Sequence, residues 1–242
     1  MLKGTGLAKS HRDHKILDVA EVQLEPGQIS VIIGPSGSGK TTLLKVLALL
    51  DPPDSGNISV DDWNCEFPLV DPGKFAPPWP KVTVVFQQLF LWPHLTLLQN
   101  ITMPVSLRHQ EQKQERLQEL IKLFDMESFI RRYPNEASLG QRQRVALVRA
   151  LLLEPKYLLL DEITSSLDVE QVAIILTHLK ELAATGIGIL TVTHLLHFAQ
   201  EAADRVIFMD SGQIVDCGGK EVLLQPRQER VKRFLSVIES AT

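Results

Sequence analysis

A glycine-rich stretch near the N-terminus constrains the fold of this chain more than any other feature. It runs Gly34-Pro35-Ser36-Gly37-Ser38-Gly39-Lys40-Thr41-Thr42 and fits the pattern of glycine, four residues, glycine, lysine and a hydroxyl residue. Glycines let the backbone curl so that successive N–H groups converge on one anion. Segment 28–33 (QISVII) is a predicted buried strand, and 43–50 (LLKVLALL) is a predicted apolar helix. This strand–loop–helix order predicts a phosphate-binding loop.

Two side chains of this loop extend the prediction to a nucleotide. The helix that follows directs its N-terminal N–H groups and the positive end of its dipole toward the phosphate. Lys40 can reach the β- and γ-phosphates, and Thr41 offers a hydroxyl to Mg²⁺. The alternative is a glycine–serine turn with a chance lysine, which the flanking strand and helix disfavour.

Strands and helices are predicted to alternate along the rest of the chain. Predicted strands lie at 19–24, 57–60, 81–86, 157–160, 187–192, 205–209 and 213–217, and predicted helices at 169–184, 196–201 and 227–240. Segment 61–80 is rich in proline and is predicted to be a structured loop, whereas 97–153 has helical periodicity. This order indicates an α/β fold with a mostly parallel sheet and a helical insertion.

Length and charge narrow the class of protein. A chain of 242 residues suits one large α/β domain or two small ones. The net charge of −4 gives no basic excess of the kind that binds nucleic acid. The apolar runs are too short to span a bilayer, and the first residues lack the apolar core of a signal peptide. Cys65 and Cys217 lie far apart and are expected to be reduced, as in a cytosolic protein.

Two acidic residues follow the predicted strand at 157–160. Asp161 and Glu162 then lie at the carboxyl end of a strand, where open α/β sheets bind ligands. Asp161 suits a metal ligand, and Glu162 suits the group that positions or deprotonates an attacking water. His194 follows the strand at 187–192 and could hold Glu162 and the water in place, although a lone histidine after a strand is more often structural. A solvated acidic strand end is the alternative for the two carboxylates.

Five segments occur in one order: GPSGSGKT, FQQ, ASLGQRQR, LLLDE with SSLD, and THLLHFA. Together they resemble the nucleotide-binding subunit of an ABC transporter, and the resemblance covers essentially the whole chain. It implies a single domain, 1–242, with a P-loop NTPase (RecA-like) core at about 1–86 and 155–242. It also implies an N-terminal antiparallel β subdomain and a helical subdomain at about 87–154 that carries the signature segment.

The resemblance assigns roles to further residues. Gln87 would contact Mg²⁺ and water and move with a membrane partner, and His194 would be the switch histidine. Asp168 would bridge two subunits. The segment Ser138-Leu139-Gly140-Gln141 would be the signature that caps ATP held by a second copy of the chain. The cofactors implied are ATP and Mg²⁺.

The function implied is an ATPase subunit bound to the cytoplasmic face of the cell membrane. ATP would close a head-to-tail homodimer, hydrolysis would reopen it, and integral membrane permease subunits would use the motion. The run FQQLFLWPHLTLLQNI and the tail QPRQERVKRFLS resemble importers of polar amino acids, which also implies a separate solute-binding protein and no nucleic acid. Alternatives are a membrane complex that signals mechanically in cell-wall or division processes, a soluble DNA-repair or translation ATPase, and a subunit that binds ATP without hydrolysing it.

Three positions depart from the family pattern. Leu139 replaces the first glycine of the signature. If this position needs a positive φ, leucine would introduce about 1–3 kcal/mol of backbone strain. If it does not, leucine would be tolerated. His11 stands where an aromatic ring stacks on adenine, with a solvated loop residue as the alternative. Ile163 replaces a proline that mainly stiffens the turn, so little consequence is expected.

Overall fold

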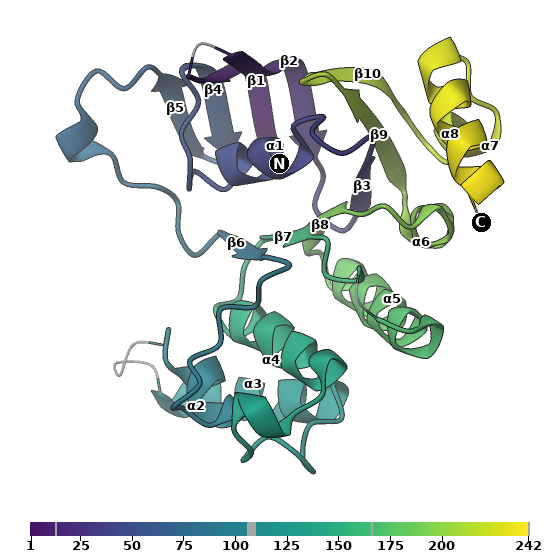
Figure 1. Cartoon of the computed structure of the whole chain (residues 1–242). Coiled ribbons are helices and arrows are strands. Elements are labelled where there is room, and N and C mark those ends of the chain that lie inside the picture. Colours follow the sequence, from purple (N-terminus) through teal and green to yellow (C-terminus); the bar gives the residue numbers. More distant parts are fainter. Residues whose placement is uncertain (13, 106–109, 166, 242) are drawn as a thin grey trace.

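The computed structural model describes residues 1–12, 14–105, 110–165 and 167–241, which form two sheets with a helix between them and the other helices around the second sheet (Figure 1). The first sheet is antiparallel, in the order β2-β1-β4-β5. Its strands are β1 (Leu2–His11), β2 (His14–Leu24), β4 (Ser55–Val60) and β5 (Trp63–Phe67). This sheet is the antiparallel N-terminal subdomain that the resemblance implied.

The second sheet is mostly parallel, as predicted, in the order β10-β9-β3-β8-β7-β6. Its strands are β3 (Ile29–Ile33), β6 (Val82–Val85), β7 (Tyr157–Asp161), β8 (Gly188–Val192), β9 (Arg205–Asp210) and β10 (Gln213–Gly218). Only the β9–β10 pair is antiparallel among the described pairings. All residues of β3, β7 and β8 are buried, which explains their continuous apolar sequences.

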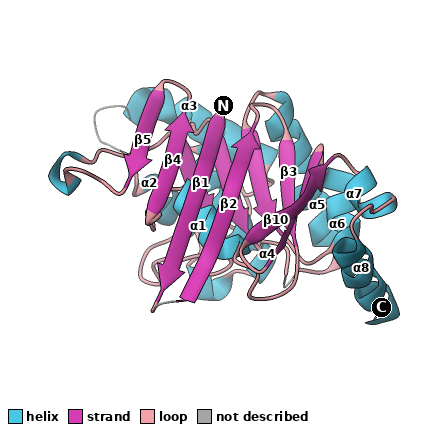
Figure 2. Cartoon of the chain, turned by 90° about the horizontal axis from the view of Figure 1, so that it is seen from above, coloured by secondary structure: helices cyan, strands magenta, loops and turns pink. Residues whose placement is uncertain are grey.

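Two apolar cores lie on opposite faces of the parallel sheet. Helix α1 (Lys40–Leu47) lies beneath the antiparallel sheet and packs between the two sheets (Figure 2), where Ile32 of β3 and Leu159 of β7 contribute side chains. The neighbouring residues Val31 and Leu160 belong to the core on the other face, because successive side chains of a strand alternate. That face is covered by α5 (Val169–Ala184), α6 (Leu196–Ala202) and the helical subdomain, and the chain ends in α7 (Glu221–Leu224) and α8 (Glu229–Ala241).

Among the described residues, the predicted helical insertion contains α2 (Leu97–Thr102), α3 (Gln110–Leu123), a 3₁₀ turn at Pro134–Glu136 and α4 (Leu139–Leu151). Helix α3 has an apolar face, because Leu117, Leu120 and Ile121 are buried together with Phe124. None of the helices in the described residues is both long enough and apolar enough to cross a bilayer.

The segment 61–80 differs from the loop that we predicted. It contains β5, which pairs with β4, and a single 3₁₀ turn at Pro72–Lys74. Trp63 and Phe67 make edge-to-face contacts with Phe75, so aromatic packing holds the proline-rich part against the sheet. Helix α1 also begins three residues earlier than predicted, inside the glycine-rich stretch.

Candidate functional site

The glycine-rich stretch forms a tight loop between β3 and α1. Gly34, Gly37 and Gly39 have φ values of 148°, 77° and 95°, which side chains disfavour. A Cβ on Gly34 would lie 2.0 Å from the carbonyl oxygen of Met209, so the loop approaches β9 too closely for any other residue. Gly39 precedes α1 and offers no side-chain cap, which leaves the first N–H groups of the helix available to an anion.

Lys40 is held inside the curve of this loop. Its Nζ donates to the carbonyl oxygens of Gly34 at 2.9 Å and Pro35 at 2.8 Å. Burial lowers the pKa of Lys40, while the nearby carboxylates of Glu162 and Asp161 act in the opposite direction. The Lys40 ammonium is therefore already held within the loop, next to backbone groups that face inward, as a phosphate site requires.

Thr41 and Asp161 meet at the carboxyl end of β7. The Thr41 hydroxyl donates to Asp161 Oδ1 at 3.0 Å, and Asp161 is only 6% exposed. Burial raises the pKa of Asp161, which the Thr41 hydrogen bond partly offsets. A hydroxyl and a carboxylate in contact form the oxygen donor set that Mg²⁺ prefers. The buried Ser38 hydroxyl has no hydrogen-bond partner among the described residues, so it can donate a hydrogen bond to a bound ligand.

Glu162 and His194 form the second pair of the site. His194 Nε2 lies 2.6 Å from Glu162 Oε1, and both side chains retain contact with solvent. Glu162 has a φ of 50°, and its N–H donates to the carbonyl of Val192 at the end of β8. His194 therefore contacts the Glu162 carboxylate and does not pack in the core, which is the arrangement that its predicted role requires.

One pocket brings these elements together. Its described lining consists of Ile16, Ser36, Gly37, Ser38, Gly39, Lys40, Thr41, Thr42, Glu162 and His194. Gln87 follows β6 and is not among these residues; its Nε2 instead donates to Ser165 Oγ at 3.1 Å. Gln87 is thus joined to the segment just beyond Glu162.

The signature residues lie outside this pocket, at the start of α4. Ser138 caps the helix: the Gln141 N–H donates to Ser138 Oγ at 3.3 Å, and the Ser138 N–H donates to Gln141 Oε1 at 3.0 Å. Asp168 likewise caps α5 by accepting from the Gln171 N–H at 2.9 Å. Both residues therefore have local structural roles, and neither lines the phosphate pocket of its own chain.

The two possibilities for Leu139 are resolved by its backbone. Leu139 is the first residue of α4, and its φ is not positive. The strain alternative therefore does not apply. Gly140 is the constrained neighbour, because a Cβ there would lie 1.6 Å from Gln171 Oε1. Glycine at this position lets α4 approach α5, unless the Gln171 side chain moves away.

The structure gives His11 no contact with the pocket. His11 is the exposed last residue of β1 and pairs with His14 across the hairpin. Ile16 lines the pocket instead, and sequence reasoning missed it. Its position follows from a close approach, since a Cβ on Gly39 would lie 3.0 Å from the Ile16 carbonyl oxygen. No local sequence pattern predicts a contact of this kind. Adenine stacking by His11 stays a prediction.

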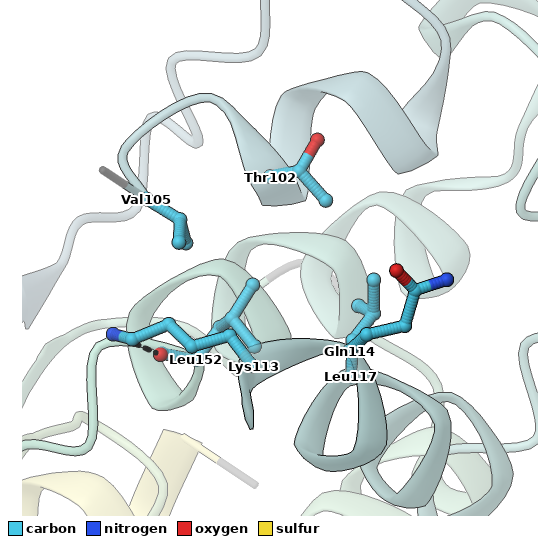
Figure 3. A pocket seen from close by; sticks show the side chains of 6 residues that line it. All are labelled: Thr102, Val105, Lys113, Gln114, Leu117 and Leu152. Carbon is cyan, nitrogen blue, oxygen red and sulfur yellow. Dashed lines mark hydrogen bonds between the residues drawn. The ribbon is translucent and has the colours of Figure 1, made fainter. Parts of the chain in front are cut away.

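A second pocket lies within the helical subdomain (Figure 3). It is lined by Thr102, Val105, Lys113, Gln114, Leu117 and Leu152. Lys113 Nζ donates to the Leu152 carbonyl at 3.2 Å, which satisfies the C-terminal end of α4. None of these lining residues belongs to the predicted site.

A protein-family model described as "ABC transporter" matches residues 17–165, which span the phosphate loop, the signature and Glu162. The chain belongs to the ABC transporter family. It is an ATPase of this family, and its α/β fold with a helical subdomain is the fold of ABC cassettes.

Relatives of this ABC ATPase match along nearly its whole length. Arginine transport ATP-binding protein ArtM of Bacillus subtilis (strain 168) is 39% identical, covering 98% of this chain and 100% of that protein. L-cystine import ATP-binding protein TcyC of the same organism is 41% identical, over 98% of both. Glutamine transport ATP-binding protein GlnQ of Escherichia coli (strain K12) is 36% identical, over 97% and 98%.

Solved structures of ABC cassettes are also similar to this ABC ATPase. The dimeric structure of MJ0796, a bacterial ABC transporter cassette, has a TM-score of 0.77 at 29% identity and covers 91% of this chain and 99% of that one. A post-hydrolysis dimer of the same cassette, bound to ADP and Pi, has a TM-score of 0.76 at 28% identity, with the same coverage.

Proposed function

We propose that this ABC ATPase powers a membrane importer of a polar amino acid or a similar small solute. The observation that carries the proposal is the convergence of Lys40, the Thr41–Asp161 pair and the Glu162–His194 pair at one pocket. The names of the relatives support the solute class, because they are transport proteins for arginine, cystine and glutamine. The same names favour import over the mechanical-signalling alternative.

The chemistry of the pocket suits hydrolysis of ATP. The loop N–H groups and Lys40 would bind the phosphates, and the unpartnered Ser38 hydroxyl would donate to one of their oxygens. Thr41, Asp161 and Gln87 would hold Mg²⁺, which when bound polarises the phosphate oxygens. The Glu162 carboxylate would accept a proton from the attacking water, and its 2.6 Å contact with His194 would keep it oriented.

The position of the signature supports a head-to-tail dimer. Ser138 and Asp168 lie outside the pocket of their own chain, so one chain supplies only part of the wall around its phosphate loop. A second copy would bring its Ser138, with the N-terminal end of its α4, to the γ-phosphate. Binding of ATP would then close the dimer, and loss of the γ-phosphate would reopen it.

An exposed apolar groove next to Gln87 supports the proposal that the protein binds a membrane subunit. It is lined by Ala48, Leu49, Leu50, Pro77, Pro78, Trp79, Val82, Thr83, Val84 and Phe86. Leu50 and Trp79 are each 60% exposed, which is unusual for large apolar side chains. We assign this groove to a cytoplasmic helix of a permease subunit, which would place the protein on the cytoplasmic face of the membrane. A separate solute-binding protein would deliver the solute from the other side.

The catalytic part of the proposal is tested with Glu162→Gln. This change preserves shape but removes the proton acceptor, so Mg²⁺-dependent phosphate release should fall at least about 100-fold while ATP binding persists. Phosphate release and nucleotide affinity are measured on the purified full-length chain. Release that is unchanged in Glu162→Gln would overturn the assigned role of Glu162.

The transport part is tested by purifying the protein from native membranes and identifying the subunits that copurify. We expect a permease with many membrane-spanning helices and an ATPase rate that one class of polar amino acid stimulates. Copurification of a four-helix membrane protein with a large external domain, without stimulation by any solute, would favour mechanical signalling instead.

A further inference from the structure

The backbone around Glu162 is held in an uncommon conformation. Glu162 has a φ of 50°, in the left-handed region that glutamate rarely adopts. The chain then turns, and the Ser165 N–H donates to the Glu162 carbonyl at 3.2 Å. Such a conformation persists only when neighbouring groups fix it. The contacts made by the residues just after Glu162 therefore decide where its carboxylate points.

One buried side chain of α4 makes such a contact. Gln143 is 4% exposed, and its Nε2 donates at 2.5 Å to the carbonyl oxygen of Ile163, the residue that follows Glu162. Ile163 is 2% exposed, so water does not compete for this carbonyl. The other amide atom, Gln143 Oε1, has no partner among the described residues. Burying an amide whose oxygen lacks a partner is unfavourable, and the bond donated to the Ile163 carbonyl offsets part of that cost.

We propose that Gln143 is a positioning residue for Glu162, and that it ties the signature helix to the hydrolytic centre of the same chain. Gln143 lies five residues after Ser138 on one continuous helix, a rise of about 7.5 Å. A displacement of the start of α4 is therefore transmitted to the Ile163 peptide.

This inference rests on the proposed function, in which Ser138 caps ATP bound by a second copy. Its consequence is a route between the two ATP sites of a dimer. ATP held by one chain contacts Ser138 of the other, and Gln143 of that other chain then fixes its own Glu162. Each site would become competent for hydrolysis only when the neighbouring site is filled.

The test compares Gln143→Leu and Gln143→Glu with the native chain. Leucine removes the donor, and an ionised glutamate cannot donate either. For both we expect the kcat of Mg²⁺-dependent ATP hydrolysis at pH 8 to fall about 10- to 100-fold, the size of effect that misplacing a reacting group by about 1 Å produces. The KM for ATP should change less than about twofold, because the phosphate loop is untouched.

The pH profile separates positioning from simple packing. A protonated glutamate can donate to the Ile163 carbonyl, so the kcat of Gln143→Glu relative to native should rise as the pH is lowered from 8 to 6. Both proteins contain the neighbouring charged groups, which are Glu162 and His194 next to Ile163 and Arg142 and Arg144 on α4. Dividing the kcat of Gln143→Glu by the native kcat at each pH therefore removes the effect of their titration. Gln143→Leu should show no such recovery. Gln118→Leu, an exposed glutamine on α3, is the matched control and should behave as native.

Each outcome either supports or overturns the positioning role of Gln143. A kcat within twofold of native in both variants, or a Gln143→Glu profile parallel to that of the native chain, would overturn the inference. If Gln143→Leu does not fold, the nearly isosteric Gln143→Glu still provides the profile. Activity that survives in Glu162→Gln would refute the catalytic role proposed for Glu162, whereas inactive Glu162→Gln with native-like Gln143 variants would refute only the positioning role.

Discussion

At the scale of single residues, Leu139 is the position whose interpretation the structure changes most. Its φ is not positive, and it begins α4 directly after the capping residue Ser138. Leucine is an ordinary helix residue there, and its N–H stays available at the end of the helix. The departure from the family pattern therefore gives no reason to expect a slow ATPase.

Replacing Leu139 by glycine tests this view. Leu139→Gly should leave the ATPase rate at saturating ATP within about twofold of native, because no strain is relieved. Glycine in a helix costs up to about 1 kcal/mol, which should lower the melting temperature by about 2–4 °C. Steady-state kinetics and thermal unfolding measure the two effects. A several-fold faster rate would show that leucine does impair the signature.

Asp61 is the residue whose charge contributes most clearly to stability. Burial alone would raise its pKa, but hydrogen bonds from the N-terminal amine, Lys156 and the Tyr157 hydroxyl outweigh this and hold the pKa of Asp61 well below its usual range. A carboxylate with a depressed folded-state pKa stabilises the fold above its unfolded pKa of about 3.9, and the contribution is lost as the pH falls further. These bonds join the β4–β5 turn to the start of β7.

We therefore expect Asp61→Asn to unfold more easily at pH 7, by about 1–3 kcal/mol, which is the range for hydrogen bonds to charged groups. The difference from native should shrink as the pH falls below about 4. Denaturant unfolding at several pH values measures it. Asp62→Asn is the matched control, since Asp62 is exposed and its surface pair with Lys81 should contribute little. A difference that is independent of pH would contradict the electrostatic explanation.

At the scale of elements, the C-terminal helix supports the phosphate loop from a distance. Arg230 of α8 forms two hydrogen bonds with Asp210, at 2.6 and 3.2 Å. Asp210 begins the turn between β9 and β10, and the N–H of Gly212 in that turn donates to the Ser38 carbonyl at 3.0 Å. The turn is thus clamped between α8 and the loop.

Removing this clamp should weaken nucleotide binding. We expect Arg230→Ala to raise the KM for ATP several-fold with a smaller change in kcat, because the loop loses support while Glu162 and His194 are unaffected. Lys232→Ala is the control, since its ion pair with Glu229 is confined to the exposed surface of α8. Equal KM values in the two variants would show that α8 does not act on the loop.

Elements differ in how well the sequence predicts them. The central strands, the phosphate loop and the Asp161–Glu162 pair were predictable, because burial on both faces gives continuous apolar runs and the loop chemistry leaves few choices of residue. Strand β5 was not predicted, although Trp63, Cys65 and Phe67 alternate with polar residues, because the run is only five residues long and prolines follow closely. The contact of Gln143 with Ile163 and the position of Ile16 depend on tertiary approach, which local patterns do not encode.

At the scale of the whole molecule, Ser138 does not line the pocket of its own chain, so in the proposed head-to-tail dimer it would cover the pocket of a second copy. Glu162→Gln, which we expect to bind ATP without hydrolysing it, should therefore form a dimer in the presence of ATP and Mg²⁺. Adding Ser138→Arg should leave it monomeric, because a long charged side chain replaces the cap. Size-exclusion chromatography with light scattering measures this. Ser236→Arg, on the exposed face of α8, is the control and should still dimerise; dimers that survive Ser138→Arg would place the interface elsewhere.

The order of strands in the parallel sheet also determines how the chain can fold during its synthesis. Strand β3 ends at Ile33, yet its neighbours β8 and β9 begin only at Gly188 and Arg205. At about 5–20 residues per second, a ribosome takes on the order of ten seconds to supply them. During that interval the mostly apolar β3 lacks both of its partner strands, and of its native contacts only those with β1, β2 and α1 come from segments made early, through Ile32. We therefore expect the early strands and α1 to cover one face of β3 while the rest of the chain is made.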